Sequence, residues 1–217
     1  MTGQIAWKDG IPVSTRFDDP YYSLEDGLAE SIHVFLSGND LPNRLNQPLH
    51  IAELGFGTGL NLLATWQLWR TGPRHPLTFT TFEAYPLSRE ATVEALAAFP
   101  SVSDLADQLL DALPLESQIE IARGLTLHLI EGDARQTLPD WQGKADAWFL
   151  DGFSPAKNPE LWDPALMAEV ARHTAPNGTF ATYTAAGHVR RALAQAGFAV
   201  DRRPGYGRKR HMSTGRL

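Results

Sequence analysis

The stretch that decides the fold is IAELGFGTGLN, residues 51–61. It continues an apolar run that begins at Leu49, and it leads into a long helical pattern. Gly55, Gly57 and Gly59 are spaced two apart, and glycines in such a turn let the backbone reverse sharply and approach a ligand closely. The helix that follows presents its unpaired N–H groups to the same place. A strand, a glycine-rich turn and a helix in this order predict an open α/β sheet with a ligand-binding crevice at the turn.

The sequence on both sides extends this pattern, because short apolar runs alternate with helical stretches, as βαβ units require. The predicted strands are residues 49–54, 77–82, 125–130, 145–150 and 179–184, then a terminal pair near 199–203 and 209–215. The predicted helices are residues 60–70, 88–99, 104–113, 159–173 and 187–196. Residues 1–45 are expected to be an irregular extension or lid with turns at Asp9-Gly10 and Asp19-Pro20 and a helix within 24–36. We expect a doubly wound, Rossmann-like α/β sheet, mostly parallel with an antiparallel C-terminal strand.

Length and composition indicate one globular domain, residues 1–217, with 43% hydrophobic and 20% charged residues. The absence of cysteine excludes disulfides and thiolate chemistry. The seven histidines form no pair at helical spacing, so no metal site is expected. No apolar run approaches the roughly 18 residues of a membrane span, and a soluble cytoplasmic protein is expected.

The net charge of −6 conceals an asymmetry between the two ends of the chain. Residues 188–217 hold eight Arg or Lys side chains and a single acidic one, Asp201, so this segment carries +7 and the rest carries −13. Such a division indicates a phosphate-binding face on an acidic body, although a solvated basic tail explains the charge equally well.

The spacing of the glycines distinguishes two kinds of nucleotide ligand. A dinucleotide fingerprint requires G-x-G-x-x-G, but Leu60 stands where its third glycine would be. The sequence instead reads G-x-G-x-G after an acid, Glu53, which resembles the first motif of S-adenosylmethionine-dependent methyltransferases. A tight strand-to-helix turn without a ligand is the alternative for the loop taken alone.

Two further acids fall at the ends of the next predicted strands. Glu83, followed by Ala84, is placed to accept from the hydroxyls of a ribose. Asp133 is placed to accept from an adenine amino group, with Ala134 offering a backbone N–H. Because the ends of parallel strands meet at one edge of the sheet, these acids are expected in one crevice. Each taken singly could instead cap a helix.

The segment expected to carry the chemistry is AWFLDGFSPAKNPELW, residues 147–162. A buried run ends at Asp151, and the following turn places Phe153 and Pro155 beside it. This resembles the acid-containing turns of amino-group methyltransferases. An alkylamine is mostly protonated near neutral pH and attacks only with a free lone pair, so the site needs a group that accepts or orients its proton. Asp151 is predicted to be that group, with a purely structural cap as the alternative.

Six segments together resemble the methyltransferase domain of the MnmC family of tRNA 5-methylaminomethyl-2-thiouridine biosynthesis proteins. They are RFDDPYYSLEDGLAESIHVFLSGNDLP, ELGFGTGLN, FEAYPLS, LDGFSPAKNPELW, TAAGHVRRALAQAGF and GYGRKRHM. The resemblance implies N-methylation of 5-aminomethyl-(2-thio)uridine at the tRNA wobble position with S-adenosyl-L-methionine. It also implies that residues 206–210 bind RNA and that Tyr22 and Ser23 close over the site. Two-domain members carry a flavin oxidase, so this chain is expected to be a stand-alone form or a fragment that binds no flavin itself.

The residues implied for cofactor binding are Asn39, Glu53, Gly55, Phe56, Gly57, Thr58, Gly59, Asn61, Glu83, Ala84, Asp133, Ala134 and Asp151. Those implied for substrate binding are Tyr22, Phe153, Pro155, Lys157, Arg208, Lys209 and Arg210. Three alternatives stay open: a methyltransferase for a small-molecule amine, a non-catalytic module that binds tRNA or cofactor, and a nicotinamide dehydrogenase.

Overall fold

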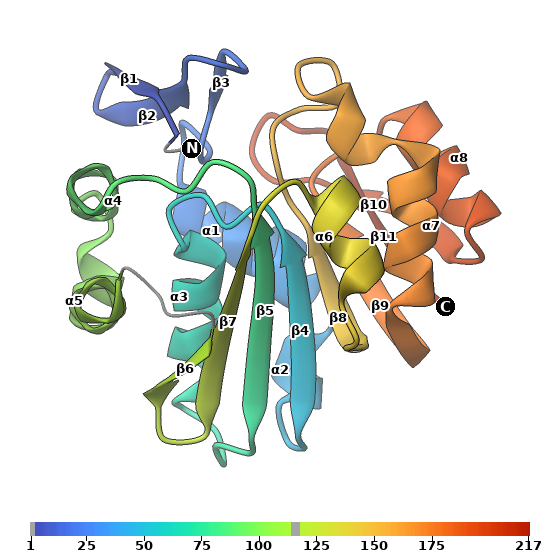
Figure 1. Ribbon diagram of the computed structural model, residues 1–217, viewed down its shortest axis with the longest axis horizontal. Coiled ribbons are helices and arrows are strands. Elements are labelled where there is room, and N and C mark those ends of the chain that lie inside the picture. Colours follow the sequence, from blue (N-terminus) through green and yellow to red (C-terminus); the bar gives the residue numbers. More distant parts are fainter. Residues whose placement is uncertain (1–2, 114–117) are drawn as a thin grey trace.

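The computed structural model describes residues 3–113 and 118–217. Within them an eight-stranded sheet has the order β10-β11-β9-β8-β4-β5-β7-β6 (Figure 1). The central strands pair in parallel, whereas β6 and β11 run antiparallel to their neighbours. The strands of this sheet are β4 Leu49–Leu54, β5 Leu77–Glu83, β6 Gln118–Ala122, β7 Leu125–Glu131, β8 Ala145–Leu150, β9 Thr174–Thr182, β10 Ala199–Pro204 and β11 His211–Arg216. The predicted α/β class and mostly parallel sheet are confirmed.

Helices cover both faces of the sheet (Figure 1). The helices that lie before β7 in the chain are α1 Gly27–Ser31, the π-helical η1 Ile32–Ser37, α2 Leu41–Arg44, α3 Leu60–Trp69, α4 Arg89–Leu96, the 3₁₀ turn η2 Pro100–Val102 and α5 Ser103–Ala112. Those that follow are α6 Ala134–Asp140, the 3₁₀ turn η3 Pro159–Trp162, α7 Pro164–Arg172 and α8 Gly187–Gln195.

The side chains of the central strands point alternately to the two faces of the sheet, which explains why helices cover both faces. In β8, Phe149 packs into the cluster under α3 and α5, whereas Trp148 and Leu150 pack into the cluster under α6, α7 and α8. Successive side chains of a strand point to opposite faces, so a strand that is apolar at every position needs helices on both sides. The crevice expected at the strand ends is thereby framed by two packed layers.

Two predicted boundaries were wrong for identifiable reasons. The single helix predicted over 159–173 is divided at Asp163, which caps α7 by accepting from Ala165 N, with Pro164 at the first helical position. The strand predicted to begin at Thr179 begins at Thr174. Its pairing with β8 starts at Thr174, is interrupted by an irregularity that includes Asn177 at φ +63°, and resumes at Thr179. In addition, β6 and α6 have no counterpart among the predicted elements.

The N-terminal extension is more ordered than predicted. Strands β1 (Ile5–Lys8), β2 (Ile11–Ser14) and β3 (Asp19–Pro20) form a small separate sheet. The predicted Asp9-Gly10 turn joins β1 to β2, and both turn residues have positive φ, as a tight hairpin requires. No helix in the described part of the chain has the length and apolarity needed to span a bilayer.

Candidate active site

The glycine-rich loop after β4 lies against the loop after β8. Gly55 and Gly57 have φ of +89° and +54°, which glycine adopts without strain. A Cβ at Gly55 would lie only 3.1 Å from the carbonyl oxygen of Asp151. Glycine is therefore what lets these two loops approach each other at the carboxyl edge of the sheet.

Glu83 ends β5 and lies beneath this loop. Its two carboxylate oxygens accept from Gly57 N at 3.1 Å and from Tyr85 N at 2.7 Å. Burial raises the pKa of Glu83, and the backbone N–H groups around it oppose that rise. Each carboxylate oxygen can accept more than one hydrogen bond, so a ribose diol could still donate to this side chain.

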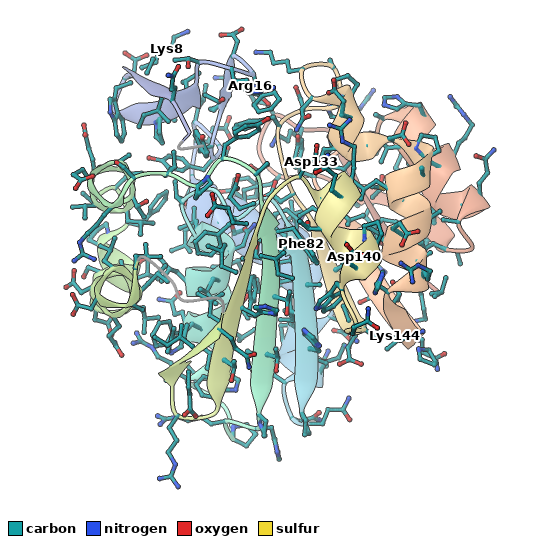
Figure 2. All side chains as sticks on the ribbon, in the orientation of Figure 1. Lys8, Arg16, Phe82, Asp133, Asp140 and Lys144 are labelled. Atoms are coloured by element: carbon teal, nitrogen blue, oxygen red, sulfur yellow. The ribbon has the colours of Figure 1, made fainter. Side chains whose placement is uncertain are left out.

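A cavity of about 150 Å³ opens on one side of Glu83, and Ala84, Asp133 and Ala134 lie in its wall. Figure 2 shows Asp133 at the carboxyl end of the sheet strands, and Arg16 lines the same cavity. Asp133 also caps α6, and both its oxygens accept from the Arg135 guanidinium, which holds the pKa of Asp133 below its usual range. Asp133 thus has the predicted position, but it already has a cationic partner.

The side-chain amide of Asn61 donates to two carboxylates, Asp151 and Glu53. Asn61 Nδ2 donates to Asp151 Oδ2 at 2.8 Å and to Glu53 Oε1 at 2.9 Å, while Gly152 N donates to Asp151 Oδ1 at 2.8 Å. Burial raises the pKa of Asp151 to about 6, against the hydrogen bonds from Asn61 and Gly152, which lower it. The carboxyl group is therefore poised to exchange a proton near neutral pH.

Glu53 lies fully buried beneath Asn61, where Thr81 Oγ1 also donates to it at 2.8 Å. Desolvation raises the pKa of Glu53 well above its usual value. It lines neither cavity, so its contact with a ligand would run through Asn61. The predicted cofactor-binding role of Glu53 is better described as positioning of that amide.

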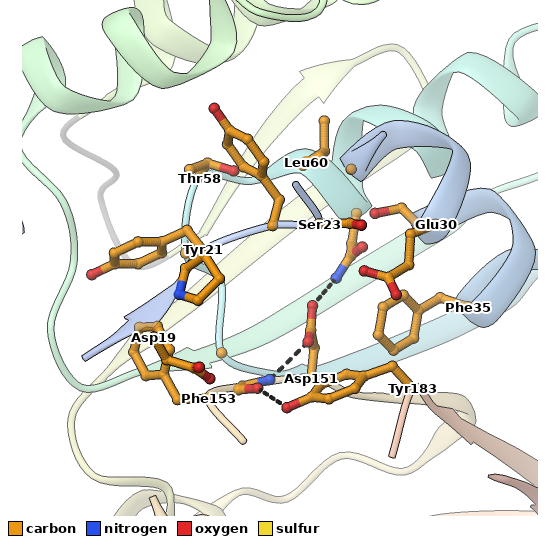
Figure 3. Close-up of a pocket in the computed structure, with 18 of the residues that line it drawn as sticks. Asp19, Tyr21, Ser23, Glu30, Phe35, Thr58, Leu60, Asp151, Phe153 and Tyr183 are labelled. Atoms are coloured by element: carbon orange, nitrogen blue, oxygen red, sulfur yellow. Dashed lines mark hydrogen bonds between the residues drawn. The ribbon is translucent and has the colours of Figure 1, made fainter. Parts of the chain in front are cut away.

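A larger cavity, of about 460 Å³, lies on the other side of Glu83 and contains the Asp151 carboxylate (Figure 3). The N-terminal extension covers it with Tyr21, Tyr22 and Ser23, and the loop between β10 and β11 reaches it with Arg208 and Lys209. The predicted residues that line it are Tyr22, Gly55, Phe56, Gly57, Thr58, Asn61, Glu83, Asp151, Phe153, Arg208 and Lys209. The structure thus gathers most of the predicted site around one space.

The predicted cofactor-binding role of Asn39 needs correction, because its side chain faces the protein interior and lines neither cavity. It is 1% exposed, and its amide donates to the carbonyl oxygens of Phe35 and Trp148 while accepting from Thr179 Oγ1. Every polar atom of this side chain already has a partner, so Asn39 holds η1 against the sheet and is not placed to bind cofactor.

Four other predicted residues lie outside the walls of both cavities: Gly59, Pro155, Lys157 and Arg210. Gly59 instead precedes α3 as its N-cap, with φ +79°. Lys157 instead pairs with Asp18 at 3.1 Å and Asp19 at 3.6 Å, which ties the turn after β8 to the N-terminal extension. Arg210 lies on the exposed loop between β10 and β11, so only a contact outside the cavities is open to it.

Tyr183 and Glu30 are among the side chains of the larger cavity that were not predicted from the sequence. Tyr183 follows β9, and its hydroxyl donates to Gly152 O at 2.8 Å beside Asp151 (Figure 3). Burial raises the pKa of Tyr183, so the hydroxyl stays protonated as a donor. Glu30 comes from α1 in the extension. A surface-type helix pattern provided no signal for Glu30, whereas the place of Tyr183 after a parallel strand could have identified it.

The two cavities adjoin, since Gly55, Glu83, Gly152 and Phe153 line both. An elongated ligand that extends past Glu83 would therefore contact residues of both cavities. The donor set suits an amino-acid group near the glycine loop, a diol at Glu83 and a flat ring near Asp133. These are the three parts of S-adenosyl-L-methionine, so the residues present fit that cofactor.

Comparisons with known proteins agree with this fit. Residues 98–217 match the family model described as S-adenosyl-L-methionine-dependent methyltransferase. The chain is 44% identical to the tRNA 5-methylaminomethyl-2-thiouridine biosynthesis bifunctional protein MnmC of Stutzerimonas stutzeri, over 99% of this chain and 34% of that protein. It is 45% identical to MnmC of Idiomarina loihiensis, over 96% and 37% respectively. The chain thus spans about a third of the length of these curated relatives.

Among solved structures, the crystal structure of MNMC2 from Aquifex aeolicus is similar with a TM-score of 0.82 and 26% identity, over 99% of this chain and 70% of that chain. The resemblance read from the motifs is confirmed by these matches. Because the family model covers more than half of the chain, this protein belongs to that family of S-adenosyl-L-methionine-dependent methyltransferases, and S-adenosyl-L-methionine is its cofactor.

Proposed function

We propose that this protein methylates the primary amine of 5-aminomethyl-(2-thio)uridine at the wobble position of tRNA, producing the 5-methylaminomethyl base. The observation that carries the proposal is the Asp151 carboxylate in the wall of the larger cavity, next to the Gly152–Phe153 turn and separated from the Asp133 cavity by Glu83. The names of the MnmC relatives support the choice of a tRNA base as substrate.

The cofactor, when bound, supplies a methyl group whose carbon–sulfur bond breaks as the amine nitrogen bonds to that carbon. The residues of the chain have to hold the nitrogen in line with the methyl group and accept its proton. Asp151 accepts an N–H of the amine, and its pKa of about 6 leaves it mostly ionised at neutral pH. The released proton passes to this carboxylate and then to water, so no metal or further group is needed to balance the step.

Aromatic side chains form a wall of the cavity against which the base would stack. Phe153 stacks on Phe17 with ring centroids 4.8 Å apart and meets the edge of Tyr21 at 5.1 Å. Tyr183 fixes the carbonyl of Gly152, which would otherwise be free to turn away from the amine. A pyrimidine ring can stack in such a wall, which orients its exocyclic amine toward Asp151.

The rest of the tRNA would lie outside the cavity. Arg202, Arg203, Arg208 and Arg210 are exposed on β10 and the loop that follows, where they can meet backbone phosphates while one base enters the cavity. We also propose that residues 1–45 act as a lid over the cofactor, that the chain works as a single domain, and that it works in the cytoplasm.

The decisive experiment is nucleoside mass analysis of aminomethyl-bearing tRNA incubated with the protein and S-adenosyl-L-methionine. We expect conversion of the aminomethyl base to its methylaminomethyl form, and no conversion with Asp151→Asn. Turnover of a nucleoside-free alkylamine at a similar rate, with no turnover of tRNA, would instead indicate a small-molecule methyltransferase. Cofactor binding without any turnover would indicate a non-catalytic module.

A further inference from the structure

Glu30 is an acid in the same cavity as Asp151 that the proposed reaction leaves without a role. It is 8% exposed although it belongs to the short helix α1 of the N-terminal extension. Figure 3 shows Glu30 beside Phe35, directed into the cavity that also contains Asp151 and Tyr183. A carboxylate enclosed in this way needs a cationic partner, because an unpaired buried charge is strongly unfavourable.

That partner is Lys209, which reaches in from the loop between β10 and β11. Its Nζ lies 2.7 Å from Glu30 Oε1 and 4.1 Å from the centre of the Tyr183 ring. The ammonium group is therefore held between a carboxylate and an aromatic face. This is the arrangement in which proteins recognise alkylammonium ligands.

We propose that Glu30 binds the protonated amine of the incoming substrate. Until the substrate arrives, the Lys209 ammonium occupies this seat, which is the position between Glu30 Oε1 and the Tyr183 ring. The inference rests on the proposed function, because it requires a primary alkylamine as substrate. Lysine is itself a primary alkylamine, so its side chain indicates the size and charge of the group that the seat accepts.

The exposures of the two partners agree with such an exchange. The Lys209 side chain is 43% exposed, whereas that of Glu30 is 11% exposed. The lysine can therefore withdraw toward solvent, while the carboxylate stays in the cavity. A substrate ammonium would replace the charge that Lys209 removes, so Glu30 is paired in both states. From Glu30 the ammonium group has only to turn toward Asp151, which lies in the same cavity and accepts its proton.

A second ion pair between the same two segments provides a matched control. Glu25 Oε1 lies 3.2 Å from Arg208 Nε, and the two side chains are 44% and 94% exposed. This pair also joins the N-terminal extension to the loop between β10 and β11, but at the exposed mouth of the same cavity. If Glu30 merely fastened that loop, loss of either acid would have the same consequence.

The test measures the affinity of the protein for an anticodon stem-loop RNA with 5-aminomethyluridine at the wobble position, divided by its affinity for the same RNA with unmodified uridine. The wild-type protein should favour the amine. Glu30→Gln should lower this ratio by about tenfold or more, as expected for loss of a charge-assisted hydrogen bond. Glu25→Gln should keep the ratio even if it weakens both affinities. Lys209→Met should raise the ratio several-fold, since nothing then competes for the seat.

An unchanged ratio in Glu30→Gln, or a fall no larger than that of Glu25→Gln, overturns the role given to Glu30. An unchanged or lower ratio in Lys209→Met overturns the role given to Lys209 and keeps the inference testable should Glu30→Gln fail to fold. Stabilisation of each variant by S-adenosyl-L-methionine in thermal melts verifies that it is folded. A wild-type protein that methylates the RNA without favouring it would refute this inference alone, whereas one that does neither would refute the proposed function as well.

Discussion

Replacement of Asp151 by Asn should make the stability of the protein less dependent on pH. Burial raises the pKa of Asp151 from 3.8 in the unfolded chain to about 6 in the folded one. The folded state therefore binds this proton more tightly, and the free energy of unfolding falls as pH rises from about 4 through 6. Each pH unit between the two pKa values corresponds to roughly 1.4 kcal/mol, so the full cost of the ionised form is at most about 3 kcal/mol. Water in the cavity reduces this figure, since the carboxylate opens onto it.

Urea unfolding of the wild type and of Asp151→Asn at several pH values between 5 and 8 measures this cost. Linkage predicts that the free-energy difference between the two proteins changes in favour of the variant by about 1.4 kcal/mol from pH 5 to pH 8. Titrating groups that do not interact with Asp151 are common to both proteins and cancel. Asp133→Asn is the control, because Arg135 lowers the pKa of Asp133 and its contribution changes only below that pH range. A difference that stays constant from pH 5 to 8 would refute the view that folding holds Asp151 at a raised pKa.

Four further outcomes are expected. Glu83→Gln should weaken S-adenosyl-L-methionine binding by about tenfold to a hundredfold in calorimetry, whereas Asp151→Asn should change it only a few-fold; equal losses would contradict their separate roles. The kcat/KM of the wild type should rise with pH through about 6 as Asp151 ionises, and a profile that is flat from pH 5 to 7 would argue against a proton-accepting role. Tyr183→Phe should lower kcat by about tenfold without changing cofactor affinity, because Gly152 O loses its donor; an unchanged kcat would show that this carbonyl needs no support. In filter binding, Arg208→Ala combined with Arg210→Ala should reduce the slope of log Kd against log salt by about 2, and an unaltered slope would show that neither residue neutralises a phosphate.

Those parts of the site that depend on local sequence could be predicted from it. Gly55 and Gly57 stand between an apolar run and a helix, and the turn they make follows from that spacing alone. Glu83 and Asp151 each end an apolar run, and the geometry of a parallel sheet brings such ends to one edge without any knowledge of side-chain contacts. The fold class followed from the same alternation of runs and helices.

The remaining parts depend on contacts between distant segments. Asp9-Gly10 was recognisable as a turn, but its flanking strands are four residues long and exist only through their pairing. Asn39 is a polar residue of a type that can bind a ligand. Its amide, however, donates to Trp148 O and accepts from Thr179 Oγ1, both more than a hundred residues away in the chain. Glu30 looks like a solvated helix residue until Lys209 and the cavity wall enclose it. Such burial is a property of the assembled layers, so no pattern within α1 could reveal it.

The distribution of charge around the cavity is what the proposed function requires, since that function needs the protein to bind a polyanion and two cations. Glu83 and Asp151 line the larger cavity and Glu53 lies buried beneath Asn61. Burial raises the pKa of all three, because an ionised carboxylate is unfavourable there without compensation. A methyl donor with a positive sulfur and a substrate with an ammonium group both supply that compensation, and a neutral ligand supplies none. Phosphates would be repelled by the same acids, so the arginines that can attract them belong at the mouth of the cavity and beyond it, on β10 and the loop that follows. Under the proposed function, only the base with its cationic amine would be complementary to the interior, and this separation of charge would select the aminomethyl group from the rest of the nucleic acid.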